Sequence, residues 1–256
     1  MILTVDAGNT NICCGVFDGD DLRLVFRVKT DRSRTPDQYA AELYMMLTMR
    51  GLGPADFDGS VIGSVVPELT RALVGAAAFA TGTTPMEIAP GVKTGINLRI
   101  DDPATLGADL LAGAVGAAAQ YELPCLVADL GTATKLTVVD RDRAFRGCVI
   151  APGVKMSLNA LSGGTSKLPA ISLETPKRVI GTNTVDCMRA GSVLGTAAML
   201  DGLIDRMEEE MGERFASLVA TGGIAKHIIG ACRREMTYDP HLLLRGLKRV
   251  WERNNA

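Results

Sequence analysis

Two short stretches of the sequence place an aspartate just before a glycine turn, a pattern that can bind phosphate. Residues 5–11 read V-D-A-G-N-T-N and residues 128–134 read A-D-L-G-T-A-T, with Asp6 and Asp129 in different halves of the 256-residue chain. Glycine lets the backbone turn tightly, and exposed N–H groups in such a turn can bind phosphate together with Asn and Thr side chains. The repeated pattern therefore predicts one phosphate-binding cradle with a turn from each of two similar halves.

Each stretch taken alone has a simpler explanation. Turns rich in Gly, Asn and Asp also close ordinary β-hairpins that bind no ligand. Both stretches follow an apolar run, as a hairpin strand would require. The presence of two matching copies favours the phosphate-binding interpretation over a plain hairpin turn.

The composition excludes several classes of protein. Hydrophobic residues make up 47% and charged residues 22%, which is typical of a globular chain. The net charge is -2 with Lys and Arg scattered, so we expect no nucleic-acid partner. The most apolar helix candidate, at residues 110–120, is too short to span a bilayer, so we expect no membrane partner. No charged and apolar leader opens the chain, and we predict a cytoplasmic location.

The cysteines and histidines give no sign of a metal site. The six cysteines have no C-x-x-C spacing, and most lie in apolar runs, so we expect reduced core thiols. They are Cys13, Cys14, Cys125, Cys148, Cys187 and Cys232. The two histidines, His227 and His241, are isolated, and we expect structural roles for both.

The elements that must position the two turns follow an order that is written twice. In the first half, strands are expected at residues 2–7, 12–17, 22–28, 60–66 and 86–89. The first three should form an antiparallel meander, and the next helix should begin at Pro36 with Thr35 as its N-cap. Another helix should begin at Pro67. A loop at residues 91–107 then leads to a helix that begins near Asp109.

The second half repeats this plan, with strands expected at residues 125–129, 136–140, 144–150 and 218–221. The order βββαβαβα, read twice, indicates a duplicated domain and not a solenoid. We therefore predict an α/β fold with two halves, residues 1–120 and 121–256. Each half should be a five-stranded mixed sheet with flanking helices, and the ligand cleft should lie between the halves.

This topology resembles the actin-like ATPase superfamily, which includes sugar kinases, heat-shock chaperones and actin. In finer detail the chain resembles the type III pantothenate kinases. The motifs that carry the resemblance are D-A-G-N-T-N at Asp6–Asn11, P-A-T-L-G-A-D at Pro103–Asp109, D-L-G-T-A-T at Asp129–Thr134, A-P-G-V at Ala151–Val154, K-L-P at Lys167–Pro169, G-T-N-T at Gly181–Thr184 and A-T-G-G-I-A at Ala220–Ala225. The resemblance implies two ribonuclease H-like domains.

The resemblance also implies an activity, the ATP-dependent phosphorylation of pantothenate to 4'-phosphopantothenate, the first step of coenzyme A biosynthesis. Asp6 would organise the metal of Mg-ATP through water, and Asp129 would bind a monovalent cation, K⁺ or NH₄⁺. Carboxylate oxygen is a suitable ligand for Mg²⁺, which keeps several of its waters. The nucleotide-binding residues implied are Asp6, Ala7, Gly8, Asn9, Thr10, Asn11, Ile12, Cys13, Gly131 and Thr132.

The residues implied for the acceptor substrate are Gly107, Ala108, Asp109, Leu110 and Thr184. Asp109 would be the general base that takes the proton of the substrate hydroxyl, although an N-cap role is the alternative. Thr184 would reach the pantothenate of a neighbouring subunit, which implies a homodimer, or it is a plain helix cap. Thr221-Gly222-Gly223 resembles an adenosine-side turn, and a simple strand-to-helix turn is equally possible.

The sequence departs from the family pattern at four places around the expected site. Leu110 stands where the family usually has Arg, and Ile100 stands where many members have Tyr. Arg146-Gly147-Cys148 replaces a Gly-Gly pair, and Lys135 replaces Thr. Lys135 could contact a phosphate, or its stem could cover the sheet.

These departures leave two further functions open. One is a kinase for a related small alcohol, and the other is a catalytically weak paralogue that binds nucleotide or pantothenate in a regulatory role. Four residues expected in the site are intact and argue against a complete loss of chemistry. They are Asp6, Asp109, Asp129 and Thr132.

Overall fold

The structure is a computed structural model that describes residues 1–164 and 168–255. It contains two compact units, one of Met1–Ala119 with His241–Ala256 and the other of Gln120–Pro240. The predicted halves, residues 1–120 and 121–256, do not coincide with these units, because the C-terminal helix belongs to the first unit. The K-L-P motif begins at Lys167, which lies outside the described residues.

The first unit is built on a five-stranded mixed sheet with the strand order β3-β2-β1-β4-β5. The strands are β1 (Ile2–Ala7), β2 (Asn11–Asp18), β3 (Asp21–Lys29), β4 (Gly59–Ser64) and β5 (Met86–Glu87). Strand β2 pairs antiparallel with both β1 and β3, and β4 pairs parallel with β1. The predicted meander is therefore confirmed.

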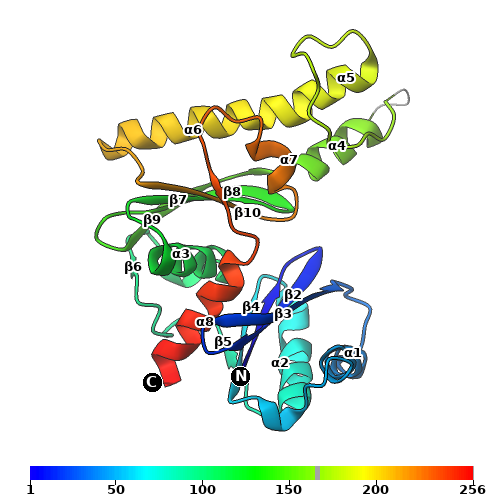
Figure 1. The fold of residues 1–256 in the computed structure, drawn as a ribbon, viewed down its shortest axis with the longest axis vertical. Coiled ribbons are helices and arrows are strands. Elements are labelled where there is room, and N and C mark those ends of the chain that lie inside the picture. The colour runs from blue at the N-terminus through cyan, green and yellow to red at the C-terminus, as the bar shows by residue number, and fades with distance from the viewer. Residues whose placement is uncertain (165–167, 256) are drawn as a thin grey trace. The chain divides into compact units, whose positions relative to one another are not determined.

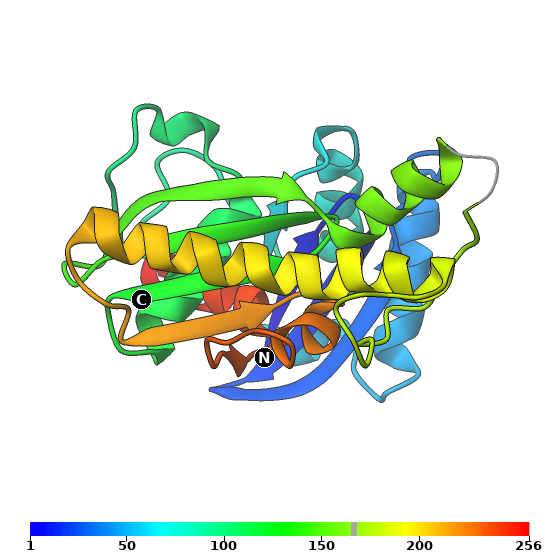
Figure 2. The ribbon, with the colours of Figure 1, turned by 90° about the horizontal axis from the view of Figure 1, so that it is seen from above.

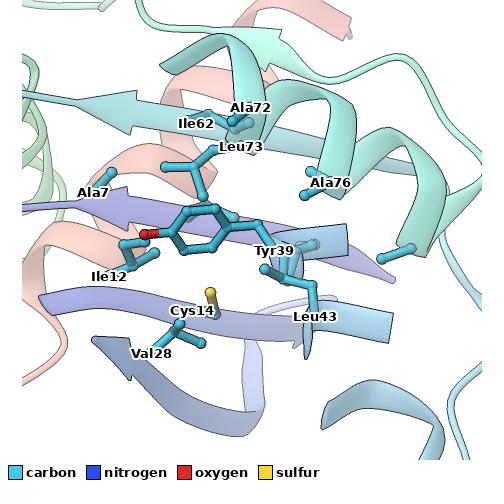
Figure 3. Packing of buried hydrophobic residues seen from close by; sticks show 14 of the residues in the cluster. Ala7, Ile12, Cys14, Val28, Tyr39, Leu43, Ile62, Ala72, Leu73 and Ala76 are labelled. Carbon is cyan, nitrogen blue, oxygen red and sulfur yellow. The ribbon is translucent and has the colours of Figure 1, made fainter. Parts of the chain in front are cut away.

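Helices α1 (Pro36–Thr48) and α2 (Pro67–Thr81) cover one face of this sheet (Figure 1). The predicted cap of α1 is confirmed, because the Thr35 side chain accepts a hydrogen bond from the Gln38 N–H. Tyr39 of α1 is fully buried among apolar side chains of the sheet and of α2 (Figure 3). Its hydroxyl donates to the carbonyl of Asp31 at 2.9 Å, so this core residue also fixes the loop after β3.

The other face of the same sheet packs against α3 (Ala108–Gln120) and α8 (Leu242–Asn255). Strand alternation separates the two faces, since Ile62 lies in the core with α1 and α2 whereas Val61 packs with α3 and α8. Small residues bring α3 and α8 close together. A methyl group at Gly246 would lie 1.8 Å from the carbonyl oxygen of Ala112.

Between β5 and α3 the chain forms only short elements, in agreement with the loop predicted at residues 91–107. These are the two-residue strand β6 (Asn97–Leu98) and a 3₁₀ turn at Pro103–Thr105. Another 3₁₀ turn, Pro54–Asp56, precedes β4. Among the residues that the structure describes, no helix combines the length and the apolar character needed to cross a membrane.

The second unit repeats the three-strand opening. Its strands are β7 (Cys125–Leu130), β8 (Ala133–Val139), β9 (Ala144–Pro152), β10 (Ser217–Thr221) and β11 (Thr237–Tyr238). They lie in the order β11-β10-β7-β8-β9, with β7, β8 and β9 antiparallel and β10 parallel to β7. The sheet to which they belong has six strands, one more than predicted.

The helices of the second unit are α4 (Val154–Gly163), α5 (Thr184–Arg189), α6 (Gly195–Met211) and α7 (Ala225–Ile229). A π-helical turn, Ala190–Leu194, joins α5 to α6. Helix α6 crosses one face of the sheet (Figure 2). It buries Leu200 and Ile204 in the core of this unit. An α/β fold with mixed sheets and flanking helices is thus confirmed in both units.

The cysteines differ partly from the expected core thiols. None of the six, all of which lie in the described part of the chain, forms a disulfide, but only Cys14 and Cys125 are buried, while Cys148 and Cys187 are exposed. Burial raises the pKa of Cys125 to about 12, so this thiol stays protonated at neutral pH. The prediction of core thiols is therefore wrong for Cys148 and Cys187, because apolar sequence neighbours do not decide which face of an element is covered.

The close approach of α3 and α8 gives a stability prediction. Gly246→Ala should lower the free energy of unfolding by about 1–3 kcal/mol, because the added methyl group must push two helices apart. The control is Gly202→Ala in α6, where a methyl group would meet nothing within 4 Å. That variant should gain up to about 1 kcal/mol from helix propensity. Urea unfolding midpoints measure both, and a Gly246→Ala protein as stable as Gly202→Ala would contradict the packing.

Candidate active site

The turn between β1 and β2 presents polar groups around Asp6. Asp6 is half-buried near the end of β1, and Asn9, Thr10 and Asn11 are exposed. The Gly8 N–H donates to the carbonyl of Asn11 at 3.1 Å and closes the turn. Strand alternation turns Asp6 toward the α3 and α8 face, since Val5 and Ala7 point into the opposite core.

Two residues expected to bind nucleotide can do so only through their backbone. The side chains of Ala7 and Ile12 are 1% and 0% exposed and lie in the core (Figure 3). Cys13 lies opposite Asp6 in the register of β1 and β2. Burial raises the pKa of the Cys13 thiol, so this side chain is neutral and not a thiolate beside the carboxylate.

Residues after β3 support the turn, although no sequence motif pointed to them. The Thr30 hydroxyl donates to the carbonyl of Gly8 at 2.7 Å, and the Thr30 N–H donates to the carbonyl of Thr10 at 3.1 Å. Arg32 donates to the side-chain oxygen of Asn9 at 3.1 Å. The signal lies in the meander itself, because β3 runs back along β2 and ends beside the β1–β2 turn.

The structure brings Asp6 and Asp109 to the same end of the first sheet. Asp6 lies directly opposite Gly63 in the parallel pair of β1 and β4. A Cβ atom on Gly63 would lie 3.5 Å from the Cβ atom of Ala108, the residue before Asp109. The backbone positions of Asp6 and Asp109 are therefore linked through Gly63 and Ala108.

Small residues also make room for the carboxylate of Asp109. A Cβ atom on Gly107 would lie 2.8 Å from Asp109 Oδ1, closer than real Cβ contacts come. The Leu110 N–H donates to this same oxygen at 2.7 Å and fixes the side chain. Asp109 follows Ala108 within the first turn of α3, so it is not the N-cap residue itself, but its carboxylate accepts a first-turn N–H as the capping alternative expected.

The second unit places Asp129 beside a lysine. Asp129 is the second-last residue of β7 and lies opposite Lys135 of β8. Lys135 Nζ lies 2.8 Å from Asp129 Oδ2, and the two side chains are 13% and 17% exposed. From the sequence we expect Lys135 to contact a phosphate or to cover the sheet with its stem. The structure shows a different contact, an ion pair with Asp129.

Three motifs of the second unit meet at the end of β7. Gly153 of A-P-G-V donates its N–H to the carbonyl of Thr132 at 3.2 Å, and a Cβ atom there would lie 2.2 Å from the same oxygen. Gly222 of A-T-G-G-I-A has a φ of +96°, and its Cβ atom would lie 2.5 Å from the Leu130 carbonyl oxygen. The Gly131–Thr132 turn is therefore held by backbone packing that only glycine permits.

Two cavities open near these motifs, both within the second unit. One of about 420 Å³ is lined by Gly223 and Ile224 together with Lys155, Asn159 and His227. The other, of about 720 Å³, is lined by Ala151 and Pro152 of A-P-G-V and by Thr184. It continues along the π-helical turn, past Gly191 and Ser192, and such turns are frequent at functional sites.

Thr184 is not a plain helix cap. The N-cap of α5 is Asn183, whose side-chain oxygen accepts from the Asp186 N–H at 2.9 Å. Thr184 is the first residue of α5 and is exposed at the wall of the larger cavity. The capping alternative for Thr184 is therefore wrong, and its side chain faces space that a ligand could fill.

The remaining departures from the family pattern have structural settings of their own. Arg146 pairs with Asp140 at 3.3 Å on the β8–β9 hairpin. Gly147 has a φ of +137°, where only glycine is comfortable, so one glycine of the usual pair is still required by the backbone. Leu110 and Ile100 are half-buried.

Among the described residues, no group of three or more His, Cys, Asp or Glu side chains could hold a metal ion. Asp6 alone could still ligate a divalent ion that other oxygen ligands complete. This fits Mg²⁺, which is usually held by one or two carboxylates, phosphate oxygens and water.

Comparison with known proteins identifies the family. A model described as type III pantothenate kinase matches residues 2–206. A type III pantothenate kinase from Exiguobacterium sibiricum is 40% identical over 254 residues, which cover 99% of this chain and 100% of that protein. One from Phenylobacterium zucineum is 40% identical over 256 residues, covering 100% and 99%. The chain belongs to the type III pantothenate kinase family.

Solved structures agree with this family's expected fold. A putative N-acetylglucosamine kinase from Porphyromonas gingivalis has a TM-score of 0.53 at 14% identity, with 100% of both chains covered. At this identity the likeness concerns the fold alone, and it supports the actin-like ATPase and sugar-kinase architecture. Membership in a pantothenate kinase family makes the chain a phosphotransferase and implies the use of ATP.

The contact of Gly153 with the Gly131–Thr132 turn gives a second prediction. Gly153→Ala should displace this turn. If the turn binds the phosphates of ATP, as the motifs predict, the KM for ATP should rise by about 10-fold or more, the effect of losing a hydrogen bond to a charged phosphate. The control is Gly163→Ala in α4, where a methyl group would meet nothing within 4 Å. Steady-state kinetics at saturating acceptor measure the effect. An unchanged KM in a folded Gly153→Ala protein would remove this turn from the nucleotide site.

Proposed function

We propose that the chain transfers the γ-phosphate of ATP to the hydroxyl group of pantothenate, which yields 4'-phosphopantothenate in the first step of coenzyme A biosynthesis. Membership in the type III pantothenate kinase family supports the reaction. The observation that carries it in this chain is that the backbone positions of Asp6 and Asp109 are neighbours through Gly63 and Ala108. One carboxylate serves the nucleotide side of the reaction, and the other serves the acceptor.

The nucleotide phosphates are proposed to lie against the β1–β2 turn. The polar side chains of Asn9, Thr10 and Asn11 are exposed there, and the guanidinium of Arg32 lies beside Asn9. Gly131 and Thr132 are the corresponding turn of the second unit. The cavity of about 420 Å³ at Gly223 has polar groups that suit the adenosine portion, which favours the adenosine-side interpretation of the Gly222-Gly223 turn.

The chemistry at Asp109 is general-base catalysis. Its carboxylate takes the proton of the pantothenate hydroxyl while that oxygen forms a bond to the γ-phosphorus. The bond from the γ-phosphorus to the bridging oxygen breaks, and its electron pair leaves with ADP. Phosphoryl transfer depends mainly on alignment and charge stabilisation, so a fixed carboxylate is sufficient. The hydrogen bond from the Leu110 N–H to Asp109 Oδ1 provides that fixation.

The two ions implied by the resemblance fit the residues differently. Asp6 would hold Mg²⁺ through water, and the ion would neutralise charge on the phosphates when bound. A monovalent cation does not fit at Asp129, because the ammonium of Lys135 already contacts that carboxylate at 2.8 Å.

The acceptor is proposed to bind with its dimethyl-substituted carbon near Leu110. In pantothenate this apolar carbon is next to the carbon that carries the hydroxyl group. Leu110 follows Asp109 in α3, so it can offer apolar surface where an Arg would offer charge. The substitution of Arg by Leu thus suits the hydroxyl end of pantothenate, although it leaves the carboxylate end to other residues.

The functional form is proposed to be a cytoplasmic homodimer in which Thr184 of one subunit contacts the pantothenate bound by the other. The exposed position of Thr184 at the wall of a 720 Å³ cavity supports this role. Large exposed side chains near the same cavity, such as Leu161 and Met156, are suited to burial by a second subunit.

Replacement of the base tests the proposed reaction. Asp109→Asn should lower turnover by about 10²-fold or more with little change in ATP binding, since the amide cannot accept the proton. Asp101→Asn, an exposed aspartate of the preceding loop, is the matched control and should turn over like the wild type. Coupled detection of ADP measures both. Wild-type turnover by Asp109→Asn would exclude Asp109 as the base.

Complementation tests the shared pocket. Asp109→Asn and Thr184→Arg should each be nearly inactive, because one lacks the base and the other blocks the cavity. Co-expressed with different tags, they should recover about a quarter of wild-type activity, since half of randomly formed dimers carry one intact site of two. Thr175→Arg, at an exposed position outside the motifs, is the control and should stay active alone. Mixed dimers without recovered activity would place Thr184 in the pocket of its own subunit.

A further inference from the structure

The ion pair of Lys135 and Asp129 is built into the sheet of the second unit. The two residues lie directly opposite each other in the antiparallel pair of β7 and β8. Opposite charges at such positions attract and help to fix the register. Because the side chains are only 13% and 17% exposed, the pair is less weakened by water and salt than a surface ion pair.

A monovalent cation would compete with the Lys135 ammonium for the same carboxylate. Both carry one positive charge, and two such charges within a few ångströms repel strongly where water is scarce. Displacement of Lys135 would also leave its ammonium without this partner in a largely buried place, which is unfavourable. K⁺ therefore gains little at Asp129 as long as Lys135 is present.

We propose that the ammonium of Lys135 takes the place of the monovalent cation at Asp129, so that this chain works without K⁺ or NH₄⁺. The inference rests on the proposed kinase function, because only a nucleotide site needs a neutralised carboxylate here. A lysine is held by the chain and does not dissociate. The activity of this chain is therefore independent of the concentration of these ions.

The position of Asp129 explains why its charge matters. A Cβ atom on Gly131 would lie 3.5 Å from Asp129 Oδ1, so the carboxylate borders the turn proposed to meet phosphate. An uncompensated carboxylate there would repel the nucleotide. Lys135 neutralises it before the nucleotide arrives, and the cross-strand register keeps the ammonium in place.

The test compares cations at constant ionic strength, with tetramethylammonium chloride replaced stepwise by KCl or NH₄Cl. Turnover and KM for ATP should change by no more than about twofold in the wild type, the scale of general salt effects. The melting temperature with bound ADP should be the same in all three salts. Lys135→Thr should gain a response, with KM for ATP falling about 10- to 150-fold as K⁺ is added, the value of one charge-assisted contact.

Two further variants separate charge from other effects. Lys135→Arg keeps the positive charge and should remain indifferent to K⁺, whereas Lys177→Met, which removes an exposed lysine of the same unit, should respond like the wild type. If Lys135→Thr does not fold, the response of the wild type and of Lys135→Arg to K⁺ still decides whether Lys135 replaces the cation.

The outcomes distinguish this proposal from the proposed function. Activity of the wild type that depends on K⁺ or NH₄⁺, or a rise in melting temperature specific to these ions, would overturn the role of Lys135 while leaving a kinase. A folded and active Lys135→Thr that ignores K⁺ would overturn it as well. If no variant phosphorylates pantothenate, the proposed function fails, and the melting temperatures alone decide whether K⁺ binds at Asp129.

Discussion

The absence of a side chain at Gly63 is the constraint on which the arrangement of the first unit depends. Gly63 lies opposite Asp6 in the sheet and against Ala108 at the start of α3. A Cβ atom on Gly63 would press on Leu247 Cδ2 of α8 at 2.9 Å, and it would meet the Cβ atom of Ala108 at 3.5 Å, so only a side chain larger than alanine would also push the start of α3 away. Gly107 then leaves space for the Asp109 carboxylate itself. The catalytic proposal therefore depends on packing, because the small residues Gly63, Gly107 and Ala108 lie between the positions of Asp6 and Asp109.

The second unit uses the same physical device for a different purpose. Gly153 and Gly222 approach backbone oxygens at the end of β7 so closely that no side chain could be tolerated. Their packing fixes the Gly131–Thr132 turn, and cross-strand pairing fixes the charge of Lys135 beside it. Motifs far apart in the sequence are thus parts of one local structure. Their glycines are required by backbone contact before any ligand is considered.

Much of this structure could be predicted from local sequence. Apolar runs between turn residues gave the meander of β1, β2 and β3, and Thr35 before Pro36 gave the start of α1. The motif order gave the family. The site roles assigned from those motifs remain predictions, although the neighbouring backbone positions of Asp6 and Asp109 agree with them.

The features that local sequence could not predict depend on long-range pairing. The contact of Arg32 with Asn9 follows from strand pairing, the partner of Lys135 follows from register, and the packing of α8 follows from small residues more than 100 positions away.

The central claim is that this chain transfers phosphate from ATP to pantothenate, and that Asp6 and Asp109 of the first unit take part in the reaction. Mass spectrometry of the products formed from ATP, Mg²⁺ and pantothenate by the wild-type chain tests it most directly. The account predicts one molecule of 4'-phosphopantothenate for each ADP, and no ADP when pantothenate is left out. Release of ADP without a phosphorylated acceptor, or binding of nucleotide without any turnover, would contradict it.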